Sequence, residues 1–266
     1  MLKANPGQTP GKRITFWPYS VLLIVAFIVF VLFLVPVQRV WEQVKTPQME
    51  VQLSGLQGTL WQGRADWAEW RTTAVQTVDW SFHPWALLRG VWEYQVNFSM
   101  EGAPVTGYLG ASIFGNLNGH DLHTQVRLEE LKSLSHNAQI TLPAAMQGEL
   151  QVQLDEIVIE QQWPSVLQGT VQLRELGLVG VATLGDWQGR LYNDANQQVI
   201  MQFAPTGDLL KGEGTVVLTQ DKQWTLTLKI KSTPEAVESE IAVLLSLLGT
   251  PDDQGFYVIT QRGRLR

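Results

Sequence analysis

The chain has 266 residues, of which 45% are hydrophobic and 17% charged, and it contains no cysteine. The absence of cysteine excludes disulfides, thiolate metal sites and cysteine nucleophiles. The formal net charge of −6, from 25 acidic and 19 basic residues, argues against nucleic acid and anionic lipid headgroups as partners.

An uncharged apolar segment lies close to the N-terminus. No charged residue occurs from Ile14 to Val37, and the centre of the segment reads VLLIVAFIVFVLFLV. About 20 helical residues cross a hydrocarbon core of about 30 Å, so residues 16–37 are predicted to form one transmembrane helix. Amphipathic rings favour the membrane interface, and the aromatic residues expected to act as interface anchors are Trp17, Tyr19 and Trp41.

The flanking charges predict the orientation of this segment. The tail, residues 1–15, carries three basic residues and no acidic one, whereas basic and acidic residues are mixed just beyond the segment. The positive-inside rule then places the tail in the cytoplasm and residues 38–266 outside it. A cleaved signal peptide is the alternative, but no small-residue cleavage site follows the apolar run, so an uncleaved anchor is favoured.

The residues beyond the segment alternate between apolar and polar side chains. The stretch WTLTLKI from Trp224 to Ile230 is one example, and residues 93–100 and 150–154 are others. Such alternation is typical of antiparallel strands with one face in a core and the other in water. Glycine, asparagine and aspartate separate the stretches as turn residues. The sequence therefore predicts a mainly β domain whose antiparallel sheet is built from successive hairpins.

A short phrase, Gln-Gly followed by any residue and then leucine or valine, recurs along this domain. The phrases begin at Gln57, Gln147, Gln168 and Gln188, and a looser relative occurs at Lys211. The last four are spaced by roughly the length of two strands and two turns. Each phrase is therefore predicted to begin one hairpin.

Two helical segments interrupt the predicted strands. Pro84 suits the first turn of a helix and Gly90 its end, so one or two helical turns are predicted between them. Apolar residues at helical spacing predict a longer amphipathic helix over residues 233–248, which would cover an open face or end of the sheet. A last strand is predicted over residues 256–261.

The sequence contains no arrangement typical of a catalytic site. The glycines between residues 55 and 63 lack the spacing of a phosphate-binding loop. His120 and His123 would point to opposite faces of a strand, and an exposed polar turn is the favoured interpretation of this stretch. Adjacent carboxylates likewise face opposite ways. We therefore predict a protein that is not an enzyme and has no catalytic residue, metal site or cofactor.

The tryptophans are concentrated in one part of the chain. Six of the 11 fall between Trp61 and Trp92. A platform for stacking sugars or binding a choline headgroup is one interpretation. Burial in the core of the sheet, at its membrane-proximal end, is the favoured one.

Two stretches of the chain resemble the type II secretion system protein N family, also called general secretion pathway protein N. They read LSGLQGTLWQG at residues 53–63 and VDWSFHPWALLRG at residues 78–90. The preceding anchor, the late helix and the closing strand extend the resemblance over essentially the whole chain. The structural residues of the family motifs are Gly55, Gly58, Trp61, Gly63, Trp80, Pro84 and Gly90.

The resemblance implies a bitopic inner-membrane protein of a Gram-negative bacterium, with a periplasmic domain of curved β-sheet over residues 38–266. It implies a non-enzymatic accessory component of the type II secretion inner-membrane platform, which supports export of folded proteins from the periplasm across the outer membrane. The expected partners are other inner-membrane components of that system and the inner membrane lipid bilayer. Similar glycine-tryptophan hairpins in the AsmA-like group imply an alternative, a periplasmic protein that binds or transports lipid or acyl chains in a β-groove.

Overall fold

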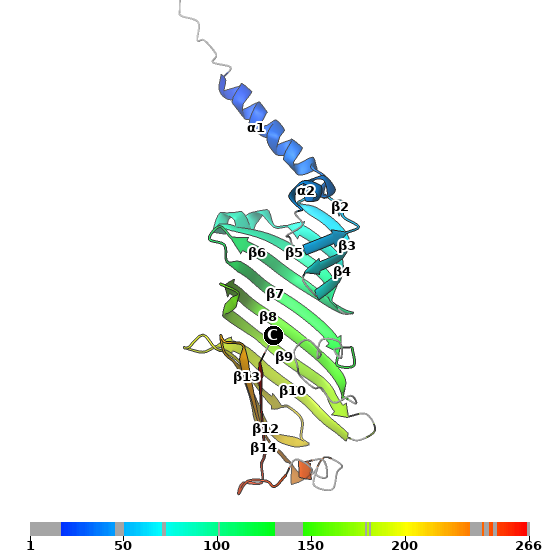
Figure 1. The fold of residues 1–266 in the computed structure, drawn as a ribbon, viewed down its shortest axis with the longest axis vertical. Coiled ribbons are helices and arrows are strands. Elements are labelled where there is room, and N and C mark those ends of the chain that lie inside the picture. The colour runs from blue at the N-terminus through cyan, green and yellow to red at the C-terminus, as the bar shows by residue number, and fades with distance from the viewer. Residues whose placement is uncertain are drawn as a thin grey trace, which may run out of the picture.

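The computed structural model describes residues 17–45, 51–70, 73–100, 102–130, 146–178, 180, 182–234, 241, 245–246 and 249–264. One antiparallel sheet of 14 strands makes up most of this part of the chain, which confirms the predicted mainly β fold. Figure 1 shows an elongated, curved sheet with helix α1 projecting from one end. The predicted cytoplasmic tail, residues 1–15, lies outside the described residues.

Order in space follows order in sequence throughout the sheet. Every strand from β3 onward pairs with the next one along the chain, β1 pairs with β3, and the two-residue strand β2 also pairs with β3. The prediction of successive antiparallel hairpins is therefore confirmed. The strands are β1 (Val51–Ser54), β2 (Gln57–Gly58), β3 (Gln62–Trp70), β4 (Thr73–Phe82), β5 (Val91–Met100), β6 (Ala103–Ser112), β7 (Leu117–Arg127), β8 (Met146–Glu160), β9 (Trp163–Leu178), β10 (Ala182–Asn193), β11 (Val199–Pro205), β12 (Leu210–Leu218), β13 (Gln223–Ser232) and β14 (Tyr257–Arg264).

The two faces of the sheet differ in chemistry. Because side chains alternate along a strand, residues that are paired across strands share a face. On one face, which we call the apolar face, a paired row runs through Leu122, Leu154, Gly169, Leu191, Met201, Val216 and Leu226. On the other, the polar face, the next row runs through His123, Gln153, Thr170, Arg190, Gln202, Thr215 and Thr227.

Three helices are described at the N-terminal end of the molecule. Helix α1 (Trp17–Leu34) covers most of the predicted transmembrane segment, and α2 (Val37–Val44) follows after Pro36. Among the described residues, no helix is both long enough and apolar enough to cross a membrane. The 3-10 helix η1 (Pro84–Arg89) lies where one or two helical turns were predicted and ends at Gly90, whose φ is 73°.

Two hydrophobic cores lie toward opposite ends of the sheet. The smaller one, beside α2, consists of Val37, Leu56 and Ala65 with partly buried neighbours such as Trp41 and Trp80. The larger one joins the later strands to residues 241 and 245. Its buried members are Leu128, Leu176, Trp187, Leu210, Ile230, Ile241 and Leu245.

The predicted late helix is described only in part. Ile241, Leu245 and Ser246 have helical backbone, and all the other residues from 235 to 248 lie outside the described residues. Ile241 and Leu245 are buried in the larger core. The closing strand is β14, which is longer than the predicted strand.

The expectation that each Gln-Gly phrase begins a hairpin is wrong for two of them. Gly169 and Gly189 lie inside β9 and β10, strands of 16 and 12 residues, and not at their ends. A Cβ atom at Gly169 would lie 2.4 Å from the carbonyl oxygen of Gln153. Glycine at position 169 therefore permits a close approach between neighbouring strands instead of a turn.

Candidate functional site

The family-motif glycines form a turn that packs against Trp80. Gly58, with a φ of 90°, pairs with Gly63 across the β2–β3 ladder. A Cβ atom at Gly63 would lie 2.4 Å from the Trp80 ring. The Trp80 indole Nε1 donates a hydrogen bond to the carbonyl oxygen of Thr59 at 3.2 Å. Gly63 therefore leaves room for the ring that holds the turn in place, and Gly55, with a φ of 67°, lies in the turn before β2.

Aromatic rings connect α1 to the first strands of the sheet. Phe33 of α1 stacks on Trp61 with ring centroids 4.8 Å apart. Trp61 in turn contacts Phe82 and Trp92, at centroid distances of 4.9 and 5.6 Å. These contacts attach the C-terminal end of α1 to β4 and β5.

The predicted burial of the clustered tryptophans holds for only some of them. Trp61, Trp67 and Trp80 are partly buried, but Trp85 is exposed. Trp85 lies on η1, in the connection between β4 and β5 and outside the strands of the sheet. Trp92 is also exposed, although it belongs to the aromatic contacts above.

The three proposed interface anchors lie on two helices. Trp41 belongs to α2 and packs against the smaller core, where its ring is partly buried. Trp17 begins α1 and Tyr19 follows two residues later, but their side chains lie outside the described part of the structure.

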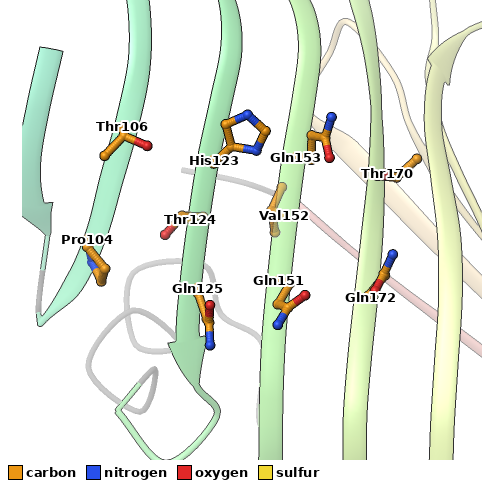
Figure 2. Close-up of a pocket in the computed structure, with 10 residues that line it drawn as sticks. All are labelled: Pro104, Thr106, His123, Thr124, Gln125, Gln151, Val152, Gln153, Thr170 and Gln172. Carbon is orange, nitrogen blue, oxygen red and sulfur yellow. The ribbon is translucent and has the colours of Figure 1, made fainter.

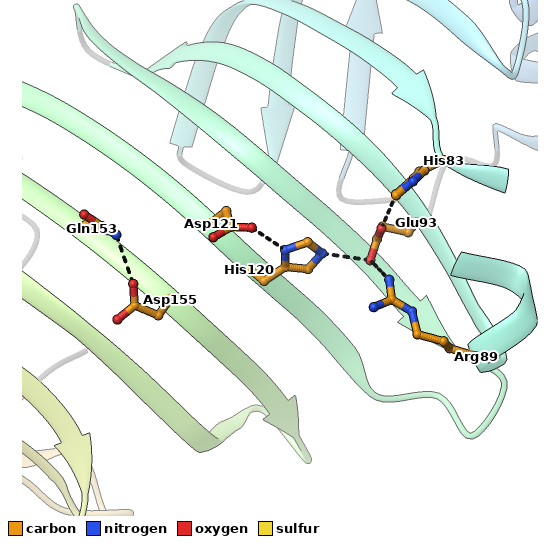
Figure 3. A network of polar contacts seen from close by, with 7 residues as sticks. All are labelled: His83, Arg89, Glu93, His120, Asp121, Gln153 and Asp155. Carbon is orange, nitrogen blue, oxygen red and sulfur yellow. Dashed lines mark hydrogen bonds and ion pairs between the residues drawn. The ribbon is translucent and has the colours of Figure 1, made fainter. Parts of the chain in front are cut away.

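A buried carboxylate on the polar face connects strands β5 and β7 and helix η1. Glu93 of β5 is 4% exposed. Its Oε1 lies 2.8 Å from His83 Nδ1, and its Oε2 lies 3.1 Å from His120 Nε2 and 3.5 Å from a guanidinium nitrogen of Arg89. Figure 3 shows His83 and His120 approaching the carboxylate from opposite sides. The Tyr108 ring stacks on His120 with a centroid distance of 4.7 Å.

Hydrogen bonds keep this buried group ionised. Burial raises the pKa of Glu93, but hydrogen bonds from His83 and His120 and the positive charges of His120 and Arg89 together lower the pKa below its ordinary value. His120 Nδ1 also lies 3.0 Å from Asp121 Oδ2. Both ring nitrogens of His120 can donate at once only when the ring is protonated. The network therefore links two carboxylates through one histidine.

The prediction of a polar turn at His120 and His123 is wrong, because both residues lie within strand β7. The prediction that a strand would point them to opposite faces is also wrong. Asp121 has a φ of 49°, and the register with β6 shifts between Tyr108 and Thr106. This bulge adds one residue to β7, so both histidines face the same side of the sheet.

The polar face is hollowed beside His123. Figure 2 shows Thr106, His123, Gln153 and Thr170 side by side on four strands. Together with Gln125, Gln151 and Gln172 they line a hollow of about 300 Å³. A second hollow of about 640 Å³ lies further along the same face, around Gln168 and Arg190. Most of these side chains are amides and hydroxyls, which suit hydrogen bonding to a polar surface.

The geometry offers no metal centre within the described part of the chain. No three histidine, cysteine, aspartate or glutamate side chains there are arranged to hold a metal ion. Glu93 bonds to His83, to His120 and to Arg89 of η1, and these contacts form a structural network that ties η1 and β7 to β5.

Sequence reasoning missed Glu93 as a buried group. It occupies a polar position in the alternating stretch from Glu93 to Met100, where exposure is the ordinary expectation. His120, its partner, is 27 residues away in sequence. The signal that could have found it is the occurrence of histidine at positions 83 and 120 together with a single acidic residue in β5.

Comparison with known proteins identifies the family. Residues 49–260 match the family model described as type II secretion system (T2SS), protein N. The chain is 24% identical over 253 residues to the type II secretion system protein N of Aeromonas hydrophila, an alignment that covers 92% of this chain and 97% of that protein. It is also 24% identical over 224 residues to the type II secretion system protein N of Vibrio cholerae, covering 81% and 85% of the two chains. No solved structure matches the chain significantly. The resemblance noted in the sequence is thus confirmed, and the chain belongs to the type II secretion system protein N family.

Proposed function

We propose that the protein is a non-enzymatic accessory component of the inner-membrane platform of the type II secretion system. In this role it supports the export of folded proteins from the periplasm across the outer membrane. The observation that carries the proposal is the family match over residues 49–260. An elongated sheet with a continuous polar face offers a long surface for other components of the platform.

The proposed location is the inner membrane. Residues 16–37 act as a single-pass anchor, because they contain no charged residue and three basic residues precede them. Residues 38–266 lie in the periplasm. Alkaline phosphatase fused after residue 266 is expected to be active in cells, since this enzyme folds only after export, and the same fusion placed after Arg13 is expected to be inactive. An inactive C-terminal fusion would overturn the orientation.

The proposed partners are other inner-membrane components of the same system, and contact is expected through the polar face. A photo-crosslinking residue at exposed Gln188 of β10 tests this in cells that carry the system. Capture of secretion components is expected. The same crosslinker at Leu109, on the apolar face of β6, is the control and is expected to capture less of these components.

The alternative of a lipid carrier has a specific structural requirement, an open apolar groove. Ile241 and Leu245 pack over the apolar face of the later strands and fill the larger core. The hollows described above lie on the polar face. Both observations support the proposed role as an accessory component of the platform over that of a lipid carrier. Capture of lipid at Leu109, with no secretion protein captured at either position, would favour the carrier.

Deletion of the protein tests whether secretion depends on it. Loss of the protein is expected to reduce the amount of secreted substrate in the medium while leaving its periplasmic folding intact. Secretion that is unchanged by deletion would exclude an indispensable role.

A further inference from the structure

We propose that the exported domain makes a second contact with the membrane, through four exposed apolar side chains beside the end of α1. This apolar corner consists of Trp85 and Leu88 of η1 and Ile113 and Phe114 of the β6–β7 turn. Its ligand is the interface of the lipid bilayer. The inference rests on the proposed anchoring of residues 16–37 in the membrane.

The corner is formed by two segments that lie against each other. The backbone N–H of Ile113 donates to the carbonyl oxygen of Gly90, at the end of η1, at 3.1 Å. The four side chains are among the most exposed large apolar groups of the described residues, at 72% for Trp85, 82% for Leu88, 78% for Ile113 and 85% for Phe114. A group of neighbouring apolar side chains at such exposure is typical of a surface that meets a protein or a membrane.

The exposed side chains are held outward by an ordered backbone. In the β6–β7 turn, Gly115 N–H donates to the Ser112 carbonyl oxygen at 2.9 Å, and Phe114 N–H donates to Ser112 Oγ at 3.2 Å. In η1, Ala86 is buried and Gly90 N–H donates to the Leu87 carbonyl oxygen at 3.0 Å. These hydrogen bonds fix the backbone of the turn and of η1. The exposure of the four side chains therefore follows from the backbone conformation.

The corner lies at the end of the sheet from which α1 projects. Trp92, two residues after η1, contacts Trp61, and Trp61 stacks on Phe33 near the end of α1. Figure 1 likewise shows β5 and β6 at the same end of the sheet as α2. Phe33 lies within the membrane if residues 16–37 are the anchor. Trp61, Trp92 and the neighbouring apolar corner would then lie at the depth of the lipid headgroups.

The chemistry of the corner fits the bilayer interface better than a charged partner. Tryptophan, leucine, isoleucine and phenylalanine are the residues that surface-bound segments bury at the boundary of headgroups and acyl chains. The charged residue of η1, Arg89, has its guanidinium directed to Glu93 at 3.5 Å. Insertion therefore requires no anionic headgroup, which agrees with the acidic composition of the chain.

The absence of cysteine from the native chain makes a direct test straightforward. Phe114→Cys in the full chain is spin-labelled after reconstitution into phosphatidylcholine vesicles. The collision rates of the label with oxygen, which partitions into lipid, and with a water-soluble nickel complex are then compared. Two matched labels serve as references, Phe27→Cys in α1 for the anchor and Val258→Cys in β14 for an exposed apolar position at the far end of the sheet.

We expect the label at position 114 to collide severalfold more often with oxygen, relative to the nickel complex, than the label at position 258 does. Trp85→Cys should give the same result. If position 27 is protected by lipid while positions 114 and 85 behave like position 258, the apolar corner is not a membrane contact, although the anchor stands. If position 27 also behaves like position 258, the anchor itself is refuted. Because the four side chains are exposed, these substitutions remove little packing and the variants are expected to fold.

Discussion

The two ends of the sheet are stabilised in different ways. At the C-terminal end, aliphatic side chains and Trp187 of the later strands pack with Ile241 and Leu245 in one buried core. At the N-terminal end the core has three buried members, and aromatic stacking, a glycine turn and a buried carboxylate add to it. That end also exposes the apolar corner. The C-terminal end is thus stabilised mainly by aliphatic packing, whereas the N-terminal end combines a small core with polar and aromatic contacts.

The largest expected effect compares two tryptophans, one at each end. Trp187→Ala empties a buried position in the larger core and is expected to lower the free energy of unfolding by about 3–5 kcal/mol. Trp85→Ala removes an exposed ring and is expected to change it by less than about 0.5 kcal/mol. Urea denaturation followed by circular dichroism measures both. If both substitutions lowered the free energy of unfolding equally, Trp85 would have to be packed like Trp187. The two ends would then not differ in the way described.

A smaller effect is expected at the glycine turn of the N-terminal end. Gly63→Ala places a Cβ atom against the Trp80 ring and is expected to cost about 1–3 kcal/mol of unfolding free energy. Gly207→Ala is the matched control, since a Cβ atom there meets no atom within 4 Å. If the two variants unfold at the same urea concentration, the turn has more room than its contacts indicate.

The buried carboxylate at the N-terminal end is expected to give a pH-dependent contribution. The pKa of Glu93 is lowered on folding, so its stabilisation is fully present above the pKa of the unfolded chain and is lost as the pH falls through the lower pKa of the folded state. Glu93→Gln should therefore lower stability by about 1–3 kcal/mol at neutral pH and flatten the loss of stability in acid.

The matched control for this carboxylate is Glu213→Gln, which changes an exposed side chain on β12. It should leave both the stability at neutral pH and the acid profile as they are. An unchanged acid profile for Glu93→Gln would show that the bonds to His83 and His120 do not stabilise the fold.

The smallest effect is expected from an exposed ion pair of the same end. Arg64 Nε lies 2.6 Å from Asp79 Oδ1, and both side chains are partly in water. Asp79→Asn is expected to shift the denaturation midpoint less than any of the buried changes above, because solvent screens such pairs. A shift comparable to that of Gly63→Ala would mean that surface charges also hold this end together.

Strand order and the two faces could be predicted because alternation persists across most of the sheet. The stretch WTLTLKI, for example, forms the centre of β13 with its leucines on the apolar face. The bulge at Asp121 could not be predicted, because one inserted residue with positive φ changes the face of a neighbour without changing composition. The lengths of β9 and β10 were also missed, since glycines inside a long strand resemble turn residues.

The candidate site was less accessible to sequence reasoning than the fold. The family motifs could be recognised from LSGLQGTLWQG and VDWSFHPWALLRG, because their glycines and tryptophans are closely spaced. The Glu93 network depends on side chains from η1, β5 and β7, which meet only after the strands pair. The exposure of Trp85 and Phe114 depends on how η1 and the β6–β7 turn are placed beyond the ends of the strands that they connect. The alternation of polar and apolar residues within single strands reveals neither arrangement.

The sequential pairing of the strands has a consequence for how the chain acquires its structure. Each new strand needs only the strand before it as a template, so ordering can follow the chain as it emerges N-terminus first. Neighbouring pairs are close in sequence, which keeps the entropy cost of each closure small. We expect chains truncated after β10 to retain protection of their early strand amides in hydrogen exchange. If the sheet forms in this order, only one edge accepts a new strand at each stage. That edge is the strand that formed last.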